Sequence, residues 1–320
     1  MRAVVRHRID DGVTDALGDV VAIDAETISV RTRLGVVTVE RVAVVAAKEV
    51  PPKPSRRGAA HLAISMEDLE RIMADGWPPL ERAELGGWLL RAAGGFTGRA
   101  NSVLPLGNPG VPLSEAVDRC ESWYEERGLR HLFCLFGPAG FRAADDPLGV
   151  ILLGRDYERF NRTLVLTAAT AMLPPETTPA SGARALLQPV PSQRWWDAWS
   201  AGDAWVAPVD EADVAPSVAR TVMTSSPDQL FASLEVEGAV IGVARIAFAQ
   251  AWAGVFALRV ATEHRRSGVA LQLMGALADA SRARGIRSMY LQVTVDNSPA
   301  RGLYEQLGFS THHEYLYLGG

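Results

Sequence analysis

The sequence predicts a chain of the α+β class, in which a small all-β segment precedes alternating helices and strands. Residues 1 to about 50 contain short apolar, β-branched runs that polar turns separate, without a helical period. A proline-rich stretch follows, and from about residue 60 onward helix patterns alternate with apolar strand patterns. Because 320 residues exceed what one ordinary core holds, we expect two or three domains.

Composition and charge exclude several classes of protein. Hydrophobic residues make up 48% and charged residues 22% of the chain, which is typical of a globular protein and argues against disorder or a membrane bundle. A net charge of −5 gives no basic field for nucleic acid, and the arginines are dispersed among acidic residues. No apolar signal core and no membrane-spanning run are evident, so we expect a cytoplasmic protein.

The first segment, 1–50, is expected to fold as a small β barrel of the SH3-like type. A linker is predicted at 51–59, because its prolines break regular structure. A plain spacer explains this composition better than a proline-rich ligand does. The strand patterns lie at 20–23, 27–30, 36–39 and 42–45.

The cysteines and histidines predict no metal site. Cys120 and Cys134 lie in different predicted elements, and we expect both to be buried apolar side chains. His312 and His313 are adjacent, but on a strand they are expected to point to opposite faces instead of toward one metal ion.

Helix and strand patterns alternate through the segments 60–185 and 186–320. In the second segment two strands flank Gly238 as in a hairpin, and a third strand leads into a basic turn. The predicted elements are helices at 65–73 and from 112 to 128, and strands at 87–91, 100–106, 129–136, 230–236, 240–248 and 255–260.

The basic turn is the most informative feature of the sequence. It follows a strand and opens a helix whose apolar stripe includes Val269 and Leu273. Such a turn exposes backbone N–H groups at the positive end of a helix, and Gly268 lets a ligand approach closely. Arg265 and Arg266 add charged donors, so the turn predicts a pyrophosphate site. The alternative is a basic helix start in which the glycine serves packing.

A second motif follows the next strand and points to a family. The turn Arg265-Arg266-Ser267-Gly268-Val269-Ala270 and the later stretch from Asn297 to Phe309 together resemble the GNAT family of N-acetyltransferases. The turn matches that family's R-x-x-G-x-G/A loop, and the later stretch matches N-x-x-A-x-x-L-Y-x-x-x-G-F. Thr262 departs from the family, which often has proline there.

The resemblance implies a mixed sheet flanked by helices and a site for acetyl-CoA. Backbone groups of Leu258 and Val260 are expected to pair with pantetheine, the turn to hold the pyrophosphate, and Asn297 to anchor the thioester end. Tyr304 is expected to face the sulfur as the catalytic residue. Asn297 also fits a helix N-cap, and Tyr304 also fits a core aromatic. The implied cofactor-binding residues are Leu258, Val260, Arg265, Arg266, Ser267, Gly268, Val269, Ala270, Asn297, Ala300 and Tyr304.

The segment 60–185 resembles a second, degenerate copy of the same fold. Gly110-Val111-Pro112-Leu113 parallels Gly268-Val269-Ala270-Leu271, and two further matches fall at a similar separation. Pro112 removes an amide from the corresponding turn, and Val150 stands at the position of Tyr304. We therefore expect this copy to bind CoA poorly and to form one wall of the acceptor cleft, while 186–320 binds acetyl-CoA.

The resemblance implies direct transfer of an acetyl group from acetyl-CoA to an amine of a small molecule or a protein, with the oxyanion held by a backbone N–H near 258–260. An alkylamine at pH 7 must lose a proton at a cost of about 4.6 kcal/mol. The strand at 255–258 has no carboxylate, so Glu235, Asp296 and His312 stay open as bases. The alternative function is an acyl-CoA sensor or scaffold whose SH3-like module binds a partner.

Overall fold

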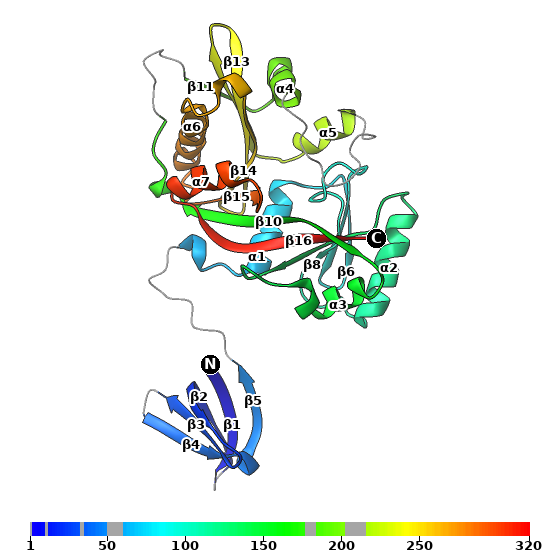
Figure 1. The fold of residues 1–320 in the computed structure, drawn as a ribbon, viewed down its shortest axis with the longest axis vertical. Coiled ribbons are helices and arrows are strands. Elements are labelled where there is room, and N and C mark those ends of the chain that lie inside the picture. The colour runs from blue at the N-terminus through cyan, green and yellow to red at the C-terminus, as the bar shows by residue number, and fades with distance from the viewer. Residues whose placement is uncertain (1, 10–11, 33–34, 50–59, 177–183, 202–215) are drawn as a thin grey trace. The chain divides into compact units, whose positions relative to one another are not determined.

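The computed structural model describes residues 2–9, 12–32, 35–49, 60–176, 184–201 and 216–320. These residues belong to two compact units, Met1–Gly58 and Ala59–Gly320 (Figure 1). The predicted linker 51–59 lies outside the described residues. Within them, no helix is long and apolar enough to cross a membrane.

The first unit is a five-stranded antiparallel sheet in the order β4-β3-β2-β1-β5. Its core contains Val5, Ala16, Val30 and Val39. In the described part of this unit no pairing joins β4 to β5, so the sheet is not a closed barrel. The strands are β1 (Arg2–Ile9), β2 (Gly12–Ile23), β3 (Thr27–Thr32), β4 (Gly35–Glu40) and β5 (Val44–Glu49).

The second unit is built on an eight-stranded mixed sheet in the order β11-β12-β13-β14-β15-β10-β16-β9, beside a three-stranded sheet β6-β7-β8. Among the named strands, β14 and β15 are the parallel pair. The strands are β6 (Glu81–Leu85), β7 (Trp88–Ala92), β8 (Leu104–Pro105), β9 (Leu132–Gly137), β10 (Glu158–Ala169), β11 (Ala185–Gln188), β12 (Gln229–Val236), β13 (Ala239–Ala249), β14 (Trp252–Val260), β15 (Ser288–Thr294) and β16 (Ser310–Gly319). The helices are α1 (Met66–Gly76), α2 (Leu113–Glu125), α3 (Pro147–Leu153), α4 (Gln193–Ser200), α5 (Pro216–Met223), α6 (Val269–Ala283) and α7 (Ser298–Gln306).

Two series of elements in this unit follow the same order. The first is β6, β7, β8, α2, β9, α3 and β10, and the second is β12, β13, β14, α6, β15, α7 and β16. A parallel bridge between Val103 and Phe133 joins the first series where β14 and β15 pair in the second. The last strand of each series pairs with the strand before last of the other, β10 with β15 and β16 with β9. One sheet therefore spans both series.

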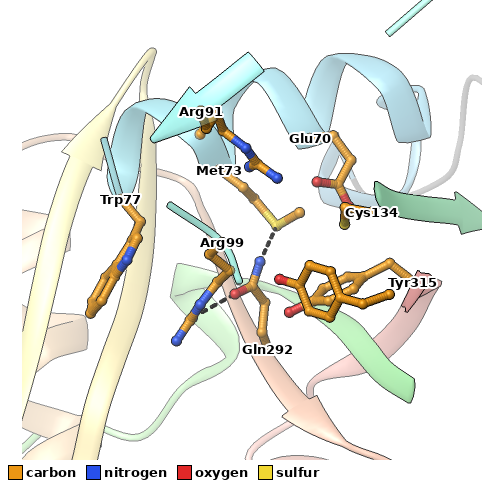
Figure 2. A pocket seen from close by; sticks show the side chains of 10 residues that line it. Glu70, Met73, Trp77, Arg91, Arg99, Cys134, Gln292 and Tyr315 are labelled. Atoms are coloured by element: carbon orange, nitrogen blue, oxygen red, sulfur yellow. Dashed lines mark hydrogen bonds between the residues drawn. The ribbon is translucent and has the colours of Figure 1, made fainter. Parts of the chain in front are cut away.

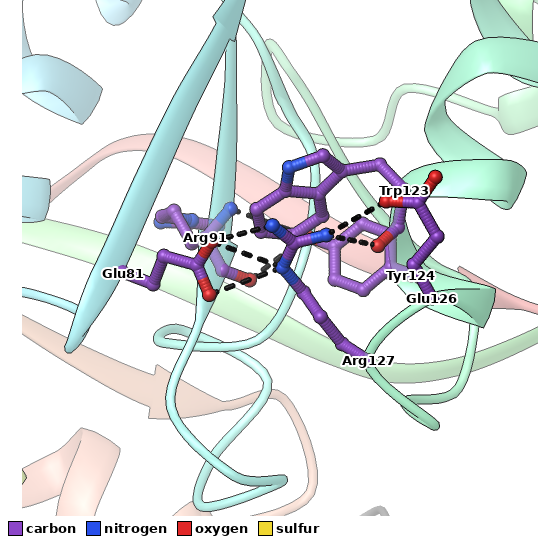
Figure 3. A network of polar contacts seen from close by, with 6 residues as sticks. All are labelled: Glu81, Arg91, Trp123, Tyr124, Glu126 and Arg127. Atoms are coloured by element: carbon purple, nitrogen blue, oxygen red, sulfur yellow. Dashed lines mark hydrogen bonds and ion pairs between the residues drawn. The ribbon is translucent and has the colours of Figure 1, made fainter.

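Polar side chains attach α2 to the hairpin of β6 and β7 (Figure 3). Arg127 forms an ion pair with Glu81, and its guanidinium lies 3.8 Å from the centroid of the Trp123 ring. The buried Tyr124 hydroxyl donates to the carbonyl of Arg91 and accepts its N–H. These contacts give the buried polar groups of Tyr124 and Arg91 hydrogen-bond partners and join α2 to the hairpin.

The prediction of a strand at 100–106 is wrong for residues 100–103, because only Leu104–Pro105 forms β8. The Asn101 side chain accepts the N–H groups of Ala93 and Gly95 and donates to the carbonyls of Phe96 and Thr97. These four bonds hold the preceding loop in turns, since an Asn side chain competes well with a strand ladder.

The expectation that His312 and His313 point to opposite faces is also wrong. The pairing of β16 with β10 skips His312, because Val165 lies opposite His313 and Leu166 lies opposite Thr311. This bulge breaks the alternation of side chains, and the two Nδ1 atoms come within 2.8 Å.

Candidate functional site

A cleft of about 830 Å³ opens where β14 and β15 separate. The described pairs between these strands run from Trp252 with Ser288 to Val255 with Leu291 and then stop. Residues 255–259 of β14 and 291–294 of β15 continue along the cleft as its lining. Two parallel strands that separate in this way leave backbone edges to which an extended ligand can add.

A bulge in β14 shapes the middle of this cleft. The pairing with β13 runs from Arg245 with Phe256 to Val243 with Arg259, so Ala257 and Leu258 of β14 stand opposite the single residue Ala244. Ala257 has a φ of 53°. Bulges of this kind redirect backbone groups, and both Ala257 and Leu258 line the cleft.

The basic turn has the geometry of an anion site. Gly268 precedes α6 with a φ of 88°, and a Cβ placed there would meet no heavy atom within 4 Å. The glycine is therefore required by the backbone, while the space beside it is open. No side chain caps α6, so its first N–H groups point out without an intrahelical acceptor. Arg265 and Arg266 are exposed beside them. Backbone and side chains together fit a diphosphate.

Helix α7 and its N-cap place three predicted residues in the cleft, Asn297, Ala300 and Tyr304. The Asn297 side chain accepts the N–H of Ala300 at 3.2 Å, which confirms the N-cap, and it also lines the cleft. Tyr304 lines the cleft with 8% of its surface exposed, and its ring packs edge-on against Phe309. Burial raises the pKa of Tyr304 to about 12. This phenol therefore stays protonated and can donate a hydrogen bond.

The structure separates the predicted site residues into two groups. Leu258, Asn297, Ala300 and Tyr304 line the cleft. Val260 instead pairs with Gly242 of β13 and lies outside the lining. The turn residues, from Arg265 to Ala270, are also not among the lining residues; they follow β14 in the chain after a short 3-10 helix at Thr262–His264.

The three residues considered as bases lie in different surroundings. Asp296 lines the cleft at the start of α7. Glu235 forms an ion pair with Arg194 on the hairpin of β12 and β13, and His312 bonds to the Ile64 carbonyl and to His313. Asp296 is therefore the one of the three with access to the cleft.

Sequence reasoning missed most of the opposite wall. The middle segment supplies Thr97, Gly98 and Arg99 from one loop and residues 161–163 from β10. Aromatic side chains complete this wall; they are Trp199, Phe256, Tyr315 and Tyr317. No local motif marks these positions, because they meet only when the two series share one sheet.

A small cavity adjoins this wall (Figure 2). Its volume of about 10 Å³ holds about one water molecule. It shares Arg99, Gln292, Tyr315 and Tyr317 with the cleft. Glu70 lines it as well and bonds to the buried His313 at 2.9 Å.

The cysteines are buried, as predicted. Burial raises the pKa of Cys120 to about 12 and raises that of Cys134 further, so both stay uncharged thiols. In the part of the chain that the structure describes, no three His, Cys, Asp or Glu side chains form a group that could hold a metal ion.

Solved structures share this fold. A GCN5-related N-acetyltransferase from Kribbella flavida matches with a TM-score of 0.57 at 17% identity, over 80% of this chain and 96% of that one. A tandem GNAT protein from the clavulanic acid biosynthesis pathway matches with a TM-score of 0.56 at 13% identity, over 84% of this chain and 91% of that one. At these identities the likeness shows the fold alone.

Two curated proteins are similar in sequence. The "Probable histone acetyltransferase Rv0428c" of Mycobacterium tuberculosis is 29% identical over 334 residues, which cover 99% of this chain and 94% of that protein. The "Uncharacterized N-acetyltransferase YobR" of Bacillus subtilis is 26% identical over 249 residues, 78% of this chain and 96% of that protein. The family described as "Probable histone acetyltransferase Rv0428c C-terminal" matches residues 65–318. The chain therefore belongs to this family of N-acetyltransferases and has the GNAT fold.

Proposed function

We propose that the protein transfers an acetyl group from acetyl-CoA directly to an amine. The observation that carries this proposal is the continuity of three features along β14: the separation from β15, the bulge and the anion-binding turn. Acetyl-CoA has its parts in a matching order: a thioester at one end, an extended pantetheine chain in the middle and a diphosphate at the other end.

Acetyl-CoA would supply an activated acyl thioester. The N–H groups from Arg266 to Ala270, with the Arg265 side chain, bind the diphosphate. Leu258 lines the pantetheine path, and Val260, which pairs with Gly242 and lies outside the cleft lining, continues β14 toward the turn. An N–H at the bulge stabilises negative charge on the thioester oxygen. Asn297 and Ala300 border the thioester end, since both precede Tyr304 on α7 and α7 lines the cleft.

An alkylamine acceptor, protonated at pH 7, first loses one proton to solvent, and it must lose a second proton as its nitrogen bonds to the acetyl carbon. We assign this proton to Asp296, directly or through a water molecule, because Asp296 lines the cleft and Glu235 and His312 do not. The C–S bond breaks in the same reaction, and the departing sulfur requires a hydrogen-bond donor.

Tyr304 provides that donor. With a pKa of about 12 against about 8.5 for a thiol, complete proton transfer from Tyr304 to a thiolate is uphill by roughly 5 kcal/mol. The phenol therefore stabilises the developing thiolate by hydrogen bonding, and the proton that completes the thiol comes from solvent.

The finer domain organisation is part of the proposal. We assign 60–185 to a degenerate GNAT-like copy and 186–320 to the copy that binds acetyl-CoA, and the repeated order of elements supports this division. We assign 1–50 to an SH3-like module and 51–59 to its linker. The compact unit at Met1–Gly58 supports the proposal that this module folds independently.

Release of free CoA thiol from acetyl-CoA, measured with the full chain across a panel of amines, tests the function. We expect release that depends on both acetyl-CoA and one class of amine. Tight binding of acetyl-CoA without release in the presence of any amine would support the sensor function instead.

A further inference from the structure

One end of the cleft holds a positive charge in a fixed position. Arg99 lies between β7 and β8, and its Nη1 donates to Oε1 of Gln292 at 2.6 Å (Figure 2). Its guanidinium also lies 4.7 Å from the ring centroid of Trp77 and 5.6 Å from that of Phe256. These contacts orient the side chain but add no negative charge, so Arg99 stays a cation at the cleft surface.

The described part of the chain offers Arg99 no ion pair. Glu70 lines the neighbouring small cavity but is bonded to His313. The other nearby arginine of this wall, Arg162, is already paired with Glu314. Arg99 therefore lines the cleft with no carboxylate partner among the described residues, and a guanidinium has more N–H donors than its bond to Gln292 uses.

A second guanidinium strengthens the positive potential. Arg245 is fully buried and lies 5.1 Å from the centroid of Trp77 and 5.0 Å from that of Phe256. Its Nη2 has no hydrogen-bond partner in the structure. Two cations beside one pair of rings repel each other weakly, and an anion bound at Arg99 would offset that repulsion.

The position of Arg99 relates it to the reacting groups. Gln292, its partner, directly follows Leu291, the last residue of β15 that pairs with β14. Arg99 thus lies where the strands separate, on the side that the middle segment contributes. Arg99 lines the same cleft as Asp296, to which we assign the amine proton, and Tyr304.

We propose that the acceptor is an amine that carries a carboxylate close to its nitrogen, as an amino acid does, and that Arg99 binds this carboxylate. The inference rests on the proposed acetyl transfer. A guanidinium binds a carboxylate through two parallel hydrogen bonds, which also fixes the orientation of the amine. The aromatic wall of Trp199, Tyr315 and Tyr317 contacts the hydrocarbon part of such an acceptor.

The same charge disfavours a lysine-rich peptide. A basic tail would bring further cations toward Arg99 in a partly enclosed cleft, where like charges are costly. The name of the relative Rv0428c refers to histones. The residues on this wall favour a different acceptor for the present chain.

The experiment compares matched acceptors. Thiol release is measured with α-, β- and γ-amino acids that bear aliphatic or aromatic side chains, with the amide of each acid, and with a lysine-rich tail peptide. We expect kcat/KM for the best acid to exceed that for its amide by about tenfold to a hundredfold, mainly through KM. In Arg99→Met this ratio is expected to fall to about one, and in Arg99→Lys to be restored in part.

Two controls separate specificity from folding. Arg130→Met removes another arginine that lies over an aromatic ring, that of Phe160, outside the cleft, and is expected to keep the ratio. The affinity for acetyl-CoA, measured by calorimetry, is expected to be the same in every variant.

Equal use of acids and amides by the wild type, or a peptide that is used as well as the best acid, would overturn the assignment of Arg99 and leave acetyl transfer standing. Absence of thiol release with every amine would overturn the proposed function itself.

Discussion

The two series of elements in the larger unit start corresponding helices in different ways. In the second series Gly268 leaves the first N–H groups of α6 without a capping side chain. In the first series α2 also has no capping side chain, but its N-cap is Pro112, which has no N–H, and the Asn108 side chain accepts the N–H of Gly110 at 2.7 Å. The first turn thus satisfies its own donor and lacks another, while the second turn keeps its donors for a ligand.

A similar difference separates the two short helices. Tyr304 on α7 is 8% exposed and lines the cleft, whereas Val150 on α3 is 54% exposed. Apolar periodicity is enough to repeat the fold, whereas the proposed chemistry depends on a few backbone N–H groups at the turn and on the Tyr304 hydroxyl. We infer that a copy can lose its chemistry through few substitutions and still serve as a wall.

The largest effect is expected from Tyr304→Phe. This change keeps the ring and removes the hydroxyl that we propose stabilises the departing thiolate, so turnover should fall by about 10² to 10⁴. The dissociation constant for acetyl-CoA should stay nearly the same. Single-turnover rates and calorimetry measure the two quantities. Val150→Tyr, the reciprocal change in the first series, should leave both unchanged, and an undiminished rate in Tyr304→Phe would return Tyr304 to a core role.

A smaller effect is expected from Gly268→Val. A β-branched residue at a φ of 88° is strained, and relief of that strain moves the N–H groups that bind the diphosphate. The dissociation constant for acetyl-CoA should rise about tenfold. Gly110→Val introduces comparable strain at a φ of 81° in the other series and should not change it. An equal rise in both variants would show that the two turns share one role.

The contacts of residues 61–64 with the final strands β10 and β16 should be sensitive to acid. Burial lowers the pKa of His61, which contacts Thr167 of β10, and that of His312, which contacts the Ile64 carbonyl. The unfolded chain therefore takes up protons on these imidazoles at a higher pH than the folded chain does. The free energy of unfolding should fall as the pH drops below about 6.5.

Urea midpoints at pH 7.5 and 5.5 measure this dependence. His61→Asn keeps a polar group near Thr167 without titrating in this range, so its midpoint should change less with pH than that of the wild type. A variant with the full pH dependence of the wild type would exclude His61 as a contributor.

The smallest effect is expected from deletion of residues 1–58. These residues form a contact unit of their own, so the dissociation constant for acetyl-CoA should stay within about twofold of the full-length value. Calorimetry on the truncated protein provides the comparison. A large loss of affinity in a folded truncation would place the first unit in the site.

The sequence alone predicts those parts of the site that are formed by residues close together in the chain. The Gly268 turn and the Asn297 cap each depend on a few neighbouring residues, and the alternation of helices and strands follows from periodicity. Arg99 and Gln292 are 193 residues apart and meet only through the shared sheet, so no spacing rule could relate them. The bulge at His312 depends in the same way on its register with β10.

The final strand of each series pairs with a strand of the other series, β10 with β15 and β16 with β9. This pairing limits how the chain can be divided into fragments that fold. A fragment that begins near residue 186 would lack β10, and the edge of β15 would then present unpaired backbone groups to solvent. Open edges of this kind recruit other chains, so such a fragment should associate or aggregate instead of folding alone. The boundary that we propose between the two copies therefore crosses one shared sheet, and we expect the cooperative folding unit to extend across it.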